Sequence, residues 1–295
     1  MSNLVLFSLV VLIWGSTWIA ITFQLGEVDP ILSVGYRFTL AALLLGLWCW
    51  WKRLPLKLPV HIHVKMAGVG LSLYTLDYSL LYASQQYIIS ALVALMSSCI
   101  IYMNVLQRRI FLKKAFRSEV LIGASLGLLG LVMIFYPEFE QVKADHFLLL
   151  GIGLAMCSFY FASVGNVISE RILDHGTPVV QMNFWAMSYG LIFIYTSAWF
   201  MGAEFVLPSQ ASYYLSLLYL AVFGSVLAFG AYMKLLQQMG SDKASFVVLV
   251  YPLVALFIST LFEGYQWSLI ALLGLVAILV GNAIAMNKLP TLRKR

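Results

Sequence analysis

The chain has 295 residues, of which 62% are hydrophobic and 10% are charged, and its mean hydropathy is +0.93. A soluble domain carries about 25% charged residues, so this composition excludes a soluble globular protein and indicates an integral membrane protein. The formal net charge of +6 is therefore interpreted as a signal of membrane orientation and not as a nucleic-acid-binding surface.

Ten apolar runs are long enough to cross the hydrocarbon layer of a bilayer as helices. The first is expected to be a retained helix and not a cleaved signal peptide. Most connections are short, so consecutive helices are expected to be antiparallel neighbours. The runs lie at residues 4–23, 31–51, 65–83, 88–107, 119–136, 147–168, 178–200, 213–237, 244–262 and 267–286.

Basic residues fall almost entirely on one side of the predicted membrane. With the exceptions of Arg37 and Lys143, every lysine and arginine lies in or beside an even-numbered connection or in the C-terminal tail. Cytoplasmic connections are enriched in lysine and arginine, so both termini are predicted to be cytoplasmic.

The two halves of the chain resemble each other. LLGLVMI at 128–134 returns as LLGLVAI at 272–278, and a proline stands at the start of both the second and the seventh helix, at Pro30 and Pro178. Five helices per half is an odd number, which inverts the second half relative to the first. We therefore predict one all-α membrane domain of ten helices, built as a 5+5 inverted repeat from residues 1–140 and 141–295, with substrate near the bilayer midplane.

The stretch from Gly240 to Glu263 contains nineteen successive uncharged residues after Lys243, with Pro252 close to their middle. Proline removes a backbone donor and clashes with the preceding turn, so a kink or a local opening is expected there. In lipid, such a defect is tolerated where neighbouring helices or a cavity satisfy the freed carbonyl. Two interpretations stay open, a packing kink and a hinge for alternating access.

Arg37 and Asp77 are the two formal charges well inside the predicted spans. Charge at mid-membrane is costly and must face the protein interior. The two residues are predicted at similar depth on sequential helices. Either they form a structural ion pair, or Arg37 meets an anionic group of a substrate while Asp77 takes an ammonium group or a proton.

Aromatic residues surround Asp77 at helical spacing. Tyr74, Tyr78 and Tyr82 share its helix face, which favours a cavity wall. Apolar walls with tyrosine hydroxyls and an amide suit amino acids or other amphipathic metabolites. The substrate-binding candidates are Trp14, Arg37, Tyr74, Asp77, Tyr78, Tyr82, Tyr102, Tyr160, Asn183, Trp185, Tyr232 and Tyr251, with Trp18, Phe159 and Phe229 as further aromatic candidates.

Other motifs indicate packing and not chemistry. Glycines at 123, 127, 130, 274 and 281 predict close contact between the fifth and tenth helices. The three cysteines lie in apolar runs and the four histidines are scattered over predicted loops, so no disulfide, metal site or cofactor is predicted.

Three motifs carry a resemblance to a known family: Trp14-Gly15-Ser16, Pro30 with Arg37-Phe38, and Gly240 to Glu263. The chain resembles EamA-type members of the drug/metabolite transporter superfamily from end to end. In the first half, Cys99 and Ile110 stand where the family pattern would place the proline and the glutamate. The resemblance implies ten helices and metabolite export or exchange, and it leaves the substrate open.

The leading functional prediction is a secondary transporter of small organic metabolites, such as amino acids, across the inner or plasma membrane by alternating access. Proton coupling is left open, and the predicted partners are the substrate and the lipid bilayer, in a monomer or homodimer. An intramembrane enzyme is the alternative, but neither a metal-ligand spacing nor a nucleophile–base pair is visible. A non-transporting assembly or sensory protein is disfavoured by the short connections, and no phosphate-binding motif suggests ATP-driven pumping.

Overall fold

A computed structural model describes residues 1–24, 26, 28–88, 93, 96–139, 146–262 and 267–286, and this part of the chain is helical without strands. The side chain of Trp18, the acidic connection at 140–145, Glu263 and the C-terminal basic tail lie outside the described parts. The elements are α1 (Asn3–Thr22), α2 (Pro30–Trp51), α3 (Val60–Val69), η1 (Gly70–Leu76), α4 (Asp77–Ser84), α6 (Cys99–Phe111), α7 (Ser118–Phe139), α8 (His146–Asp174), α9 (Val179–Phe200), α10 (Ala211–Tyr219), η2 (Leu220–Leu227), α11 (Ala228–Met239), α12 (Ser241–Ala244), α13 (Val247–Phe262) and α14 (Leu269–Ala285).

The prediction of an all-α membrane protein is confirmed. By length and composition, five helical stretches in the described residues are suited to cross a membrane, and two shorter apolar helices, Asn3–Thr17 and Leu269–Ala285, accompany them. The number of ten spans stays a prediction. The five stretches are Pro30–Trp51, Ser118–Tyr136, His146–Asp174, Ala211–Met239 and Ser241–Ile258.

Local sequence explains where several helices begin. Asp29 caps α2, because its carboxylate accepts a hydrogen bond from the backbone N–H of Ile31 at 2.9 Å and Pro30 occupies the first helical turn. Ser268 caps α14 in the same way. Pro252 lies inside α13 and the helix continues through it. The interruption falls earlier, at 245–246 between α12 and α13.

Two π-helical segments interrupt the third and eighth predicted runs, which the hydropathy pattern predicts as continuous helices. η1 joins α3 to α4, and η2 joins α10 to α11. In η1 the Thr75 hydroxyl lies 3.1 Å from the carbonyl oxygens of Gly70 and Gly190, so this side chain is within hydrogen-bond distance of carbonyls in both η1 and α9. Such segments are frequent at functional sites.

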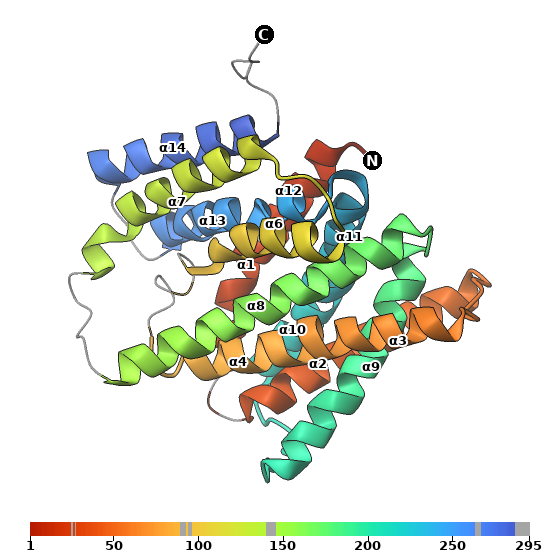
Figure 1. The fold of residues 1–295 in the computed structure, drawn as a ribbon. Helices are drawn as coiled ribbons and strands as arrows, with labels where there is room; N and C mark the ends of the chain where they lie inside the picture. Colours follow the sequence, from red (N-terminus) through yellow and green to blue (C-terminus); the bar gives the residue numbers. More distant parts are fainter. Residues whose placement is uncertain are drawn as a thin grey trace.

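The predicted close contact between the glycine-bearing helices is confirmed. α7 and α14 lie side by side (Figure 1) and touch through their backbones. A Cβ atom on Gly274 would lie 2.6 Å from the carbonyl oxygen of Gly130, and one on Gly281 would lie 2.5 Å from that of Gly123. Only glycine allows this approach at these positions.

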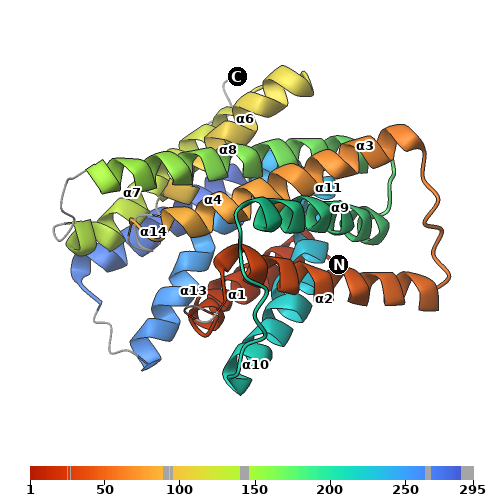
Figure 2. The same cartoon turned by 90° about the horizontal axis from the view of Figure 1, so that it is seen from below.

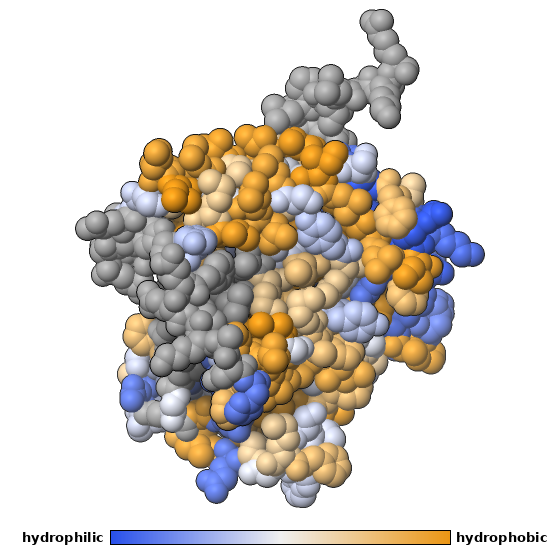
Figure 3. Space-filling model, turned by 60° about the vertical axis from the view of Figure 1, so that its left-hand side comes forward, coloured by the Kyte–Doolittle hydropathy of each residue, from blue (hydrophilic) through white to orange (hydrophobic). Residues whose placement is uncertain are grey.

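The halves of the chain interleave around the centre of the molecule (Figure 2). α2 packs on α9, α1 packs on α13 and α11, and α8 packs on α4 and α6. Apolar side chains cover much of the outer face drawn in Figure 3, as expected for a surface in contact with lipid.

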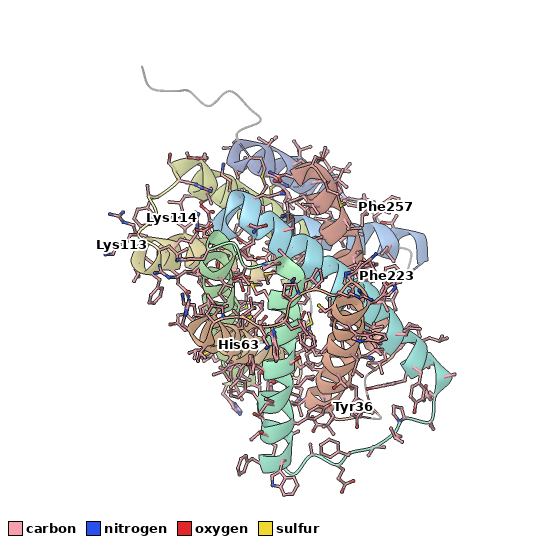
Figure 4. All side chains as sticks on the ribbon, turned by 90° about the vertical axis from the view of Figure 1, so that its right-hand side faces the viewer. Tyr36, His63, Lys113, Lys114, Phe223 and Phe257 are labelled. Atoms are coloured by element: carbon pink, nitrogen blue, oxygen red, sulfur yellow. The ribbon has the colours of Figure 1, made fainter. Side chains whose placement is uncertain are left out.

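Two of the connections that the sequence predicts on the cytoplasmic side lie at one end. The α2–α3 and α8–α9 connections lie at the same end of the molecule in Figures 1 and 2. Figure 4 looks onto this end, with Lys113 and Lys114 projecting from its edge.

Candidate functional site

A cavity of about 150 Å³ lies between helices of both halves, and most of its walls are apolar or aromatic. Its few polar groups include two formal charges. Its lining residues are Trp14, Thr17, Ile21, Arg37, Leu73, Asp77, Tyr78, Leu81, Tyr82, Gln85, Ser97, Ile100, Phe159, Ala162, Asn166, Phe229, Tyr232, Val248 and Tyr251.

Arg37 enters the cavity from α2 and is 2% exposed. Its Nε donates to the hydroxyl of Ser225 at 2.8 Å, and its Cζ lies 5.4 Å from the centre of the Tyr78 ring, within the range of a cation–π contact. Gly224 makes room for the guanidinium, because a Cβ there would lie 3.0 Å from Nη2 of Arg37. The π-helical segment η2 therefore supplies both the space and the hydrogen-bond acceptor that position this charge.

Asp77 begins α4, directly after η1, and is 9% exposed. Its Oδ1 accepts a hydrogen bond from the buried hydroxyl of Ser158 on α8 at 2.6 Å. None of the ion pairs in the described residues joins Asp77 to Arg37 or to another cation. The direct pairing that the sequence left open is therefore not formed, and both charges face the cavity separately.

The aromatic side chains of the cavity pack on one another. Trp14 stands with its ring centre 5.2 Å from that of Phe229 and 5.1 Å from that of Tyr232, and its Nε1 donates to the carbonyl oxygen of Gly224 at 3.2 Å. The rings of Phe38 and Tyr78 meet edge to face at 5.3 Å. Mutual packing of these rings, together with Phe38 behind them, holds the aromatic wall of the cavity in place.

The structure brings most of the sequence-predicted candidates to this cavity. Asn166, Thr17, Ser97 and Gln85 were not among the predicted residues, and neither were the supporting hydroxyls of Ser158 and Ser225. The signal that could have found Asn166 is an amide inside an apolar run. The predicted residues that line the cavity are Trp14, Arg37, Asp77, Tyr78, Tyr82, Tyr232 and Tyr251, together with Phe159 and Phe229.

Five predicted residues lie elsewhere. Tyr74 is fully buried behind the cavity, where its hydroxyl lies 3.5 Å from Oδ1 of Asn183. Trp185 donates to the carbonyl oxygen of Leu56 at 3.1 Å. Tyr102 pairs with the hydroxyl of Ser125 at 3.0 Å, and Tyr160 is half exposed. Helical spacing placed these residues at a suitable depth, but helix rotation turns their side chains away.

Within the described parts of the chain, no group of three or more histidine, cysteine, aspartate or glutamate side chains is placed to hold a metal ion. What the cavity offers chemically is one cation, one anion, hydroxyl and amide groups, and an aromatic wall.

Comparison with known proteins identifies a family. The sequence profile of the EamA-like transporter family matches residues 1–136 and 149–287. Protein PagO of Salmonella typhimurium is 24% identical over 279 residues, which cover 94% of this chain and 90% of that protein. A probable amino-acid metabolite efflux pump of Escherichia coli K12 is 22% identical over 285 residues, covering 94% and 92%.

Two further likenesses cover nearly the whole chain. The uncharacterized inner membrane transporter YedA of Escherichia coli K12 is 27% identical over 269 residues, covering 90% of this chain and 84% of that protein. A crystal structure of another protein superposes with a TM-score of 0.80 over 99% of both chains at 18% identity, which shows a shared fold. The matched profile spans both halves of the sequence, and the chain therefore belongs to the EamA-like transporter family of the drug/metabolite transporter superfamily, a family of membrane transporters.

Proposed function

We propose that this membrane transporter is a secondary carrier of small zwitterionic metabolites, with amino acids as the leading class, and that it works by alternating access. One observation carries the proposal. Arg37 and Asp77 face the same cavity from different helices without pairing with each other.

Two separated opposite charges match the two charged groups of a zwitterion. The guanidinium of Arg37 presents N–H donors suited to a carboxylate, and charge-assisted hydrogen bonds of this kind are the strong ones. The carboxylate of Asp77 accepts from an ammonium group. Because an isolated buried charge is costly, each charge gains from a ligand that supplies its counterpart.

The size of the cavity supports a small substrate. An apolar protein cavity of about 150 Å³ accommodates a molecule such as benzene. This cavity has about the same volume, 150 Å³, and aromatic and aliphatic walls for an apolar side chain. The name of the Escherichia coli relative, a probable amino-acid metabolite efflux pump, points in the same direction.

The inverted repeat with ten spans is part of this proposal. In the proposed repeat, α1 corresponds to α8, α6 to α13, α2 to α9 and η1 to η2. Two pairs of contacts support it: α1 packs on α13 while its counterpart α8 packs on α6, and α2 packs on η2 while its counterpart α9 packs on η1. Such reciprocal contacts are expected when two halves are related by a pseudo-two-fold axis. We also propose that the protein lies in the inner or plasma membrane with both termini in the cytoplasm, because nearly all lysine and arginine residues fall on one side of the predicted spans.

The test is solute flux in sealed proteoliposomes that contain the purified protein. We expect counterflow of a labelled zwitterionic amino acid that exceeds the flux in protein-free vesicles. Matched compounds that lack the amino group or the carboxylate should compete poorly. Binding without flux would contradict the transport mechanism, and flux of compounds with neither charged group would contradict the substrate class.

A further inference from the structure

A second cluster of buried charges lies outside the cavity. Arg108 on α6 makes a bidentate contact with Glu170 on α8, with its Nε 2.8 Å from Oε2 and its Nη2 2.7 Å from Oε1. Its Nη1 lies 2.6 Å from Oδ2 of Asp242 on α12. The three side chains are 4%, 2% and 2% exposed, so the network excludes water. It therefore ties together three helices from both halves of the chain.

Residues next to Gly240 add hydrogen bonds to this network, and Gly240 leaves room for it. Both the backbone N–H and the hydroxyl of Ser241 donate to Oε2 of Glu170, at 2.9 and 2.7 Å. Gly240 has a φ of 90°, and a Cβ there would lie 2.5 Å from Nη2 of Arg108. Arg117 adds a contact of 3.1 Å to Oδ1 of Asp242. Two cations and two carboxylates thus balance in charge.

The network lies directly beyond one end of the cavity. On α8, Glu170 follows the cavity residue Asn166 by one helical turn, which is about 6 Å for four residues. On α6, Arg108 follows the cavity residue Ile100 by two turns. The opposite part of the lining reaches Ile21, near the end of α1, and Gln85, just after α4.

Several polar atoms of buried amide side chains on α6 and α8, between the cavity and the network, have no hydrogen-bond partner within the described residues. They are Oδ1 of Asn166, Oδ1 of Asn104 and both side-chain polar atoms of Gln107. Each of these residues is at most 5% exposed. Burying an unpaired polar group costs free energy, and such groups in a native structure need an explanation. A route for a polar solute and its water supplies one.

We propose that the path of the substrate continues from the cavity past Asn166 and Asn104, between α6, α8 and α12, and that Arg108, Glu170 and Asp242 form the gate that closes it. This proposal rests on the proposed transport function. The gate has two stable arrangements, because the charges are satisfied by each other when dry and by water when the helices part. Packed interfaces in proteins typically switch between two such arrangements and do not deform continuously.

The first test measures access to the path and needs no transported substrate. In a protein with Cys49, Cys99 and Cys157 replaced by serine, Asn166→Cys is treated in sealed vesicles with a small membrane-impermeant thiol reagent applied on the side of the α6–α7 connection. Lys114→Cys reports that side. We expect Asn166→Cys to react slowly there and at least about tenfold faster once Arg108→Gln opens the gate.

Arg109→Gln is the matched control, because Arg109 is the exposed neighbour of Arg108. It should leave the reaction rate of Asn166→Cys unchanged. The proposal would be overturned if Asn166→Cys reacted equally slowly in a folded protein that also carries Arg108→Gln. It would also be overturned if Asn166→Cys reacted fast from this side while Arg108 is still present.

A second variant avoids disturbing the charges. Nδ2 of Asn104 lies 3.1 Å from the hydroxyl of Ser245, so Asn104→Cys with Ser245→Cys places two thiols across the path. Oxidation should stop amino-acid counterflow, and a reductant should restore it. Full flux with the disulfide formed would overturn the gate. If the reduced double-cysteine protein shows no amino-acid flux but Arg108→Gln still speeds the labelling of Asn166→Cys, the proposed substrate is overturned and the gate is supported.

Discussion

Replacing Asp77 by asparagine tests the role of the cavity carboxylate. The change removes the charge and keeps nearly the same volume, and Ser158 can still donate to the amide oxygen across the present 2.6 Å contact. A hydrogen bond to a charged group contributes about 1.5–3 kcal/mol. Loss of that contribution weakens the affinity for an ammonium-bearing ligand about 10- to 150-fold, since about 1.4 kcal/mol corresponds to a factor of ten.

The measurement is ligand-dependent thermal stabilisation of the purified protein, followed by isothermal titration with the best ligand. Three matched compounds are compared, a zwitterionic amino acid, its deamino carboxylic acid and its decarboxylated amine. Asp77→Asn should weaken the binding of the amino acid and the amine and spare the deamino acid. Arg37→Gln should weaken the amino acid and the deamino acid and spare the amine.

Asp174→Asn serves as the control, because this carboxylate lies on the same helix as Ser158 but is 39% exposed in a surface ion pair. It should change none of the affinities. Equal affinity of the wild-type and Asp77→Asn proteins for the amine would refute the assignment. Retained counterflow with no response to a pH gradient in Asp77→Asn would identify Asp77 as the site of proton coupling.

Two further predictions concern backbone geometry. Gly130→Leu should lower the stability of the folded protein by about 1–3 kcal/mol in thermal unfolding, because its side chain would overpack the α7–α14 contact, whereas Gly153→Leu, where a Cβ meets nothing within 4 Å, should not. Pro252→Ala should slow counterflow per folded molecule and leave the ligand affinity unchanged if the proline is a hinge; unchanged turnover with altered stability would assign it to packing alone.

The sequence predicts much of the candidate site by type and depth, but not by contact. Arg37 and Asp77 stand out because formal charges are rare inside apolar runs. Their hydrogen-bond partners do not stand out, since Ser225 is 188 positions from Arg37 and Ser158 is 81 positions from Asp77. Serine is common in membrane helices, so no local pattern selects these two.

The rotation of each helix about its axis is also not predictable from the sequence. Asn183 and Trp185 have a suitable depth, yet their side chains meet Tyr74 and the carbonyl of Leu56 and not the cavity. The charged cluster is not predictable from the sequence for a different reason. Arg108, Glu170 and Asp242 lie just outside the ends of the predicted spans, where charges are normally solvated.

The sequence by itself determined that the chain is a helical membrane protein and that its fifth and tenth predicted helices approach closely. These properties are local, because a helix in lipid must satisfy its own backbone hydrogen bonds and so requires a long apolar run. Only the tertiary structure decided that Arg37 and Asp77 stay apart across one cavity and that Arg108 is locked by Glu170 and Asp242 beyond it. Those contacts join residues far apart in the chain, and they depend on the rotation and offset of packed helices, which hydropathy does not encode.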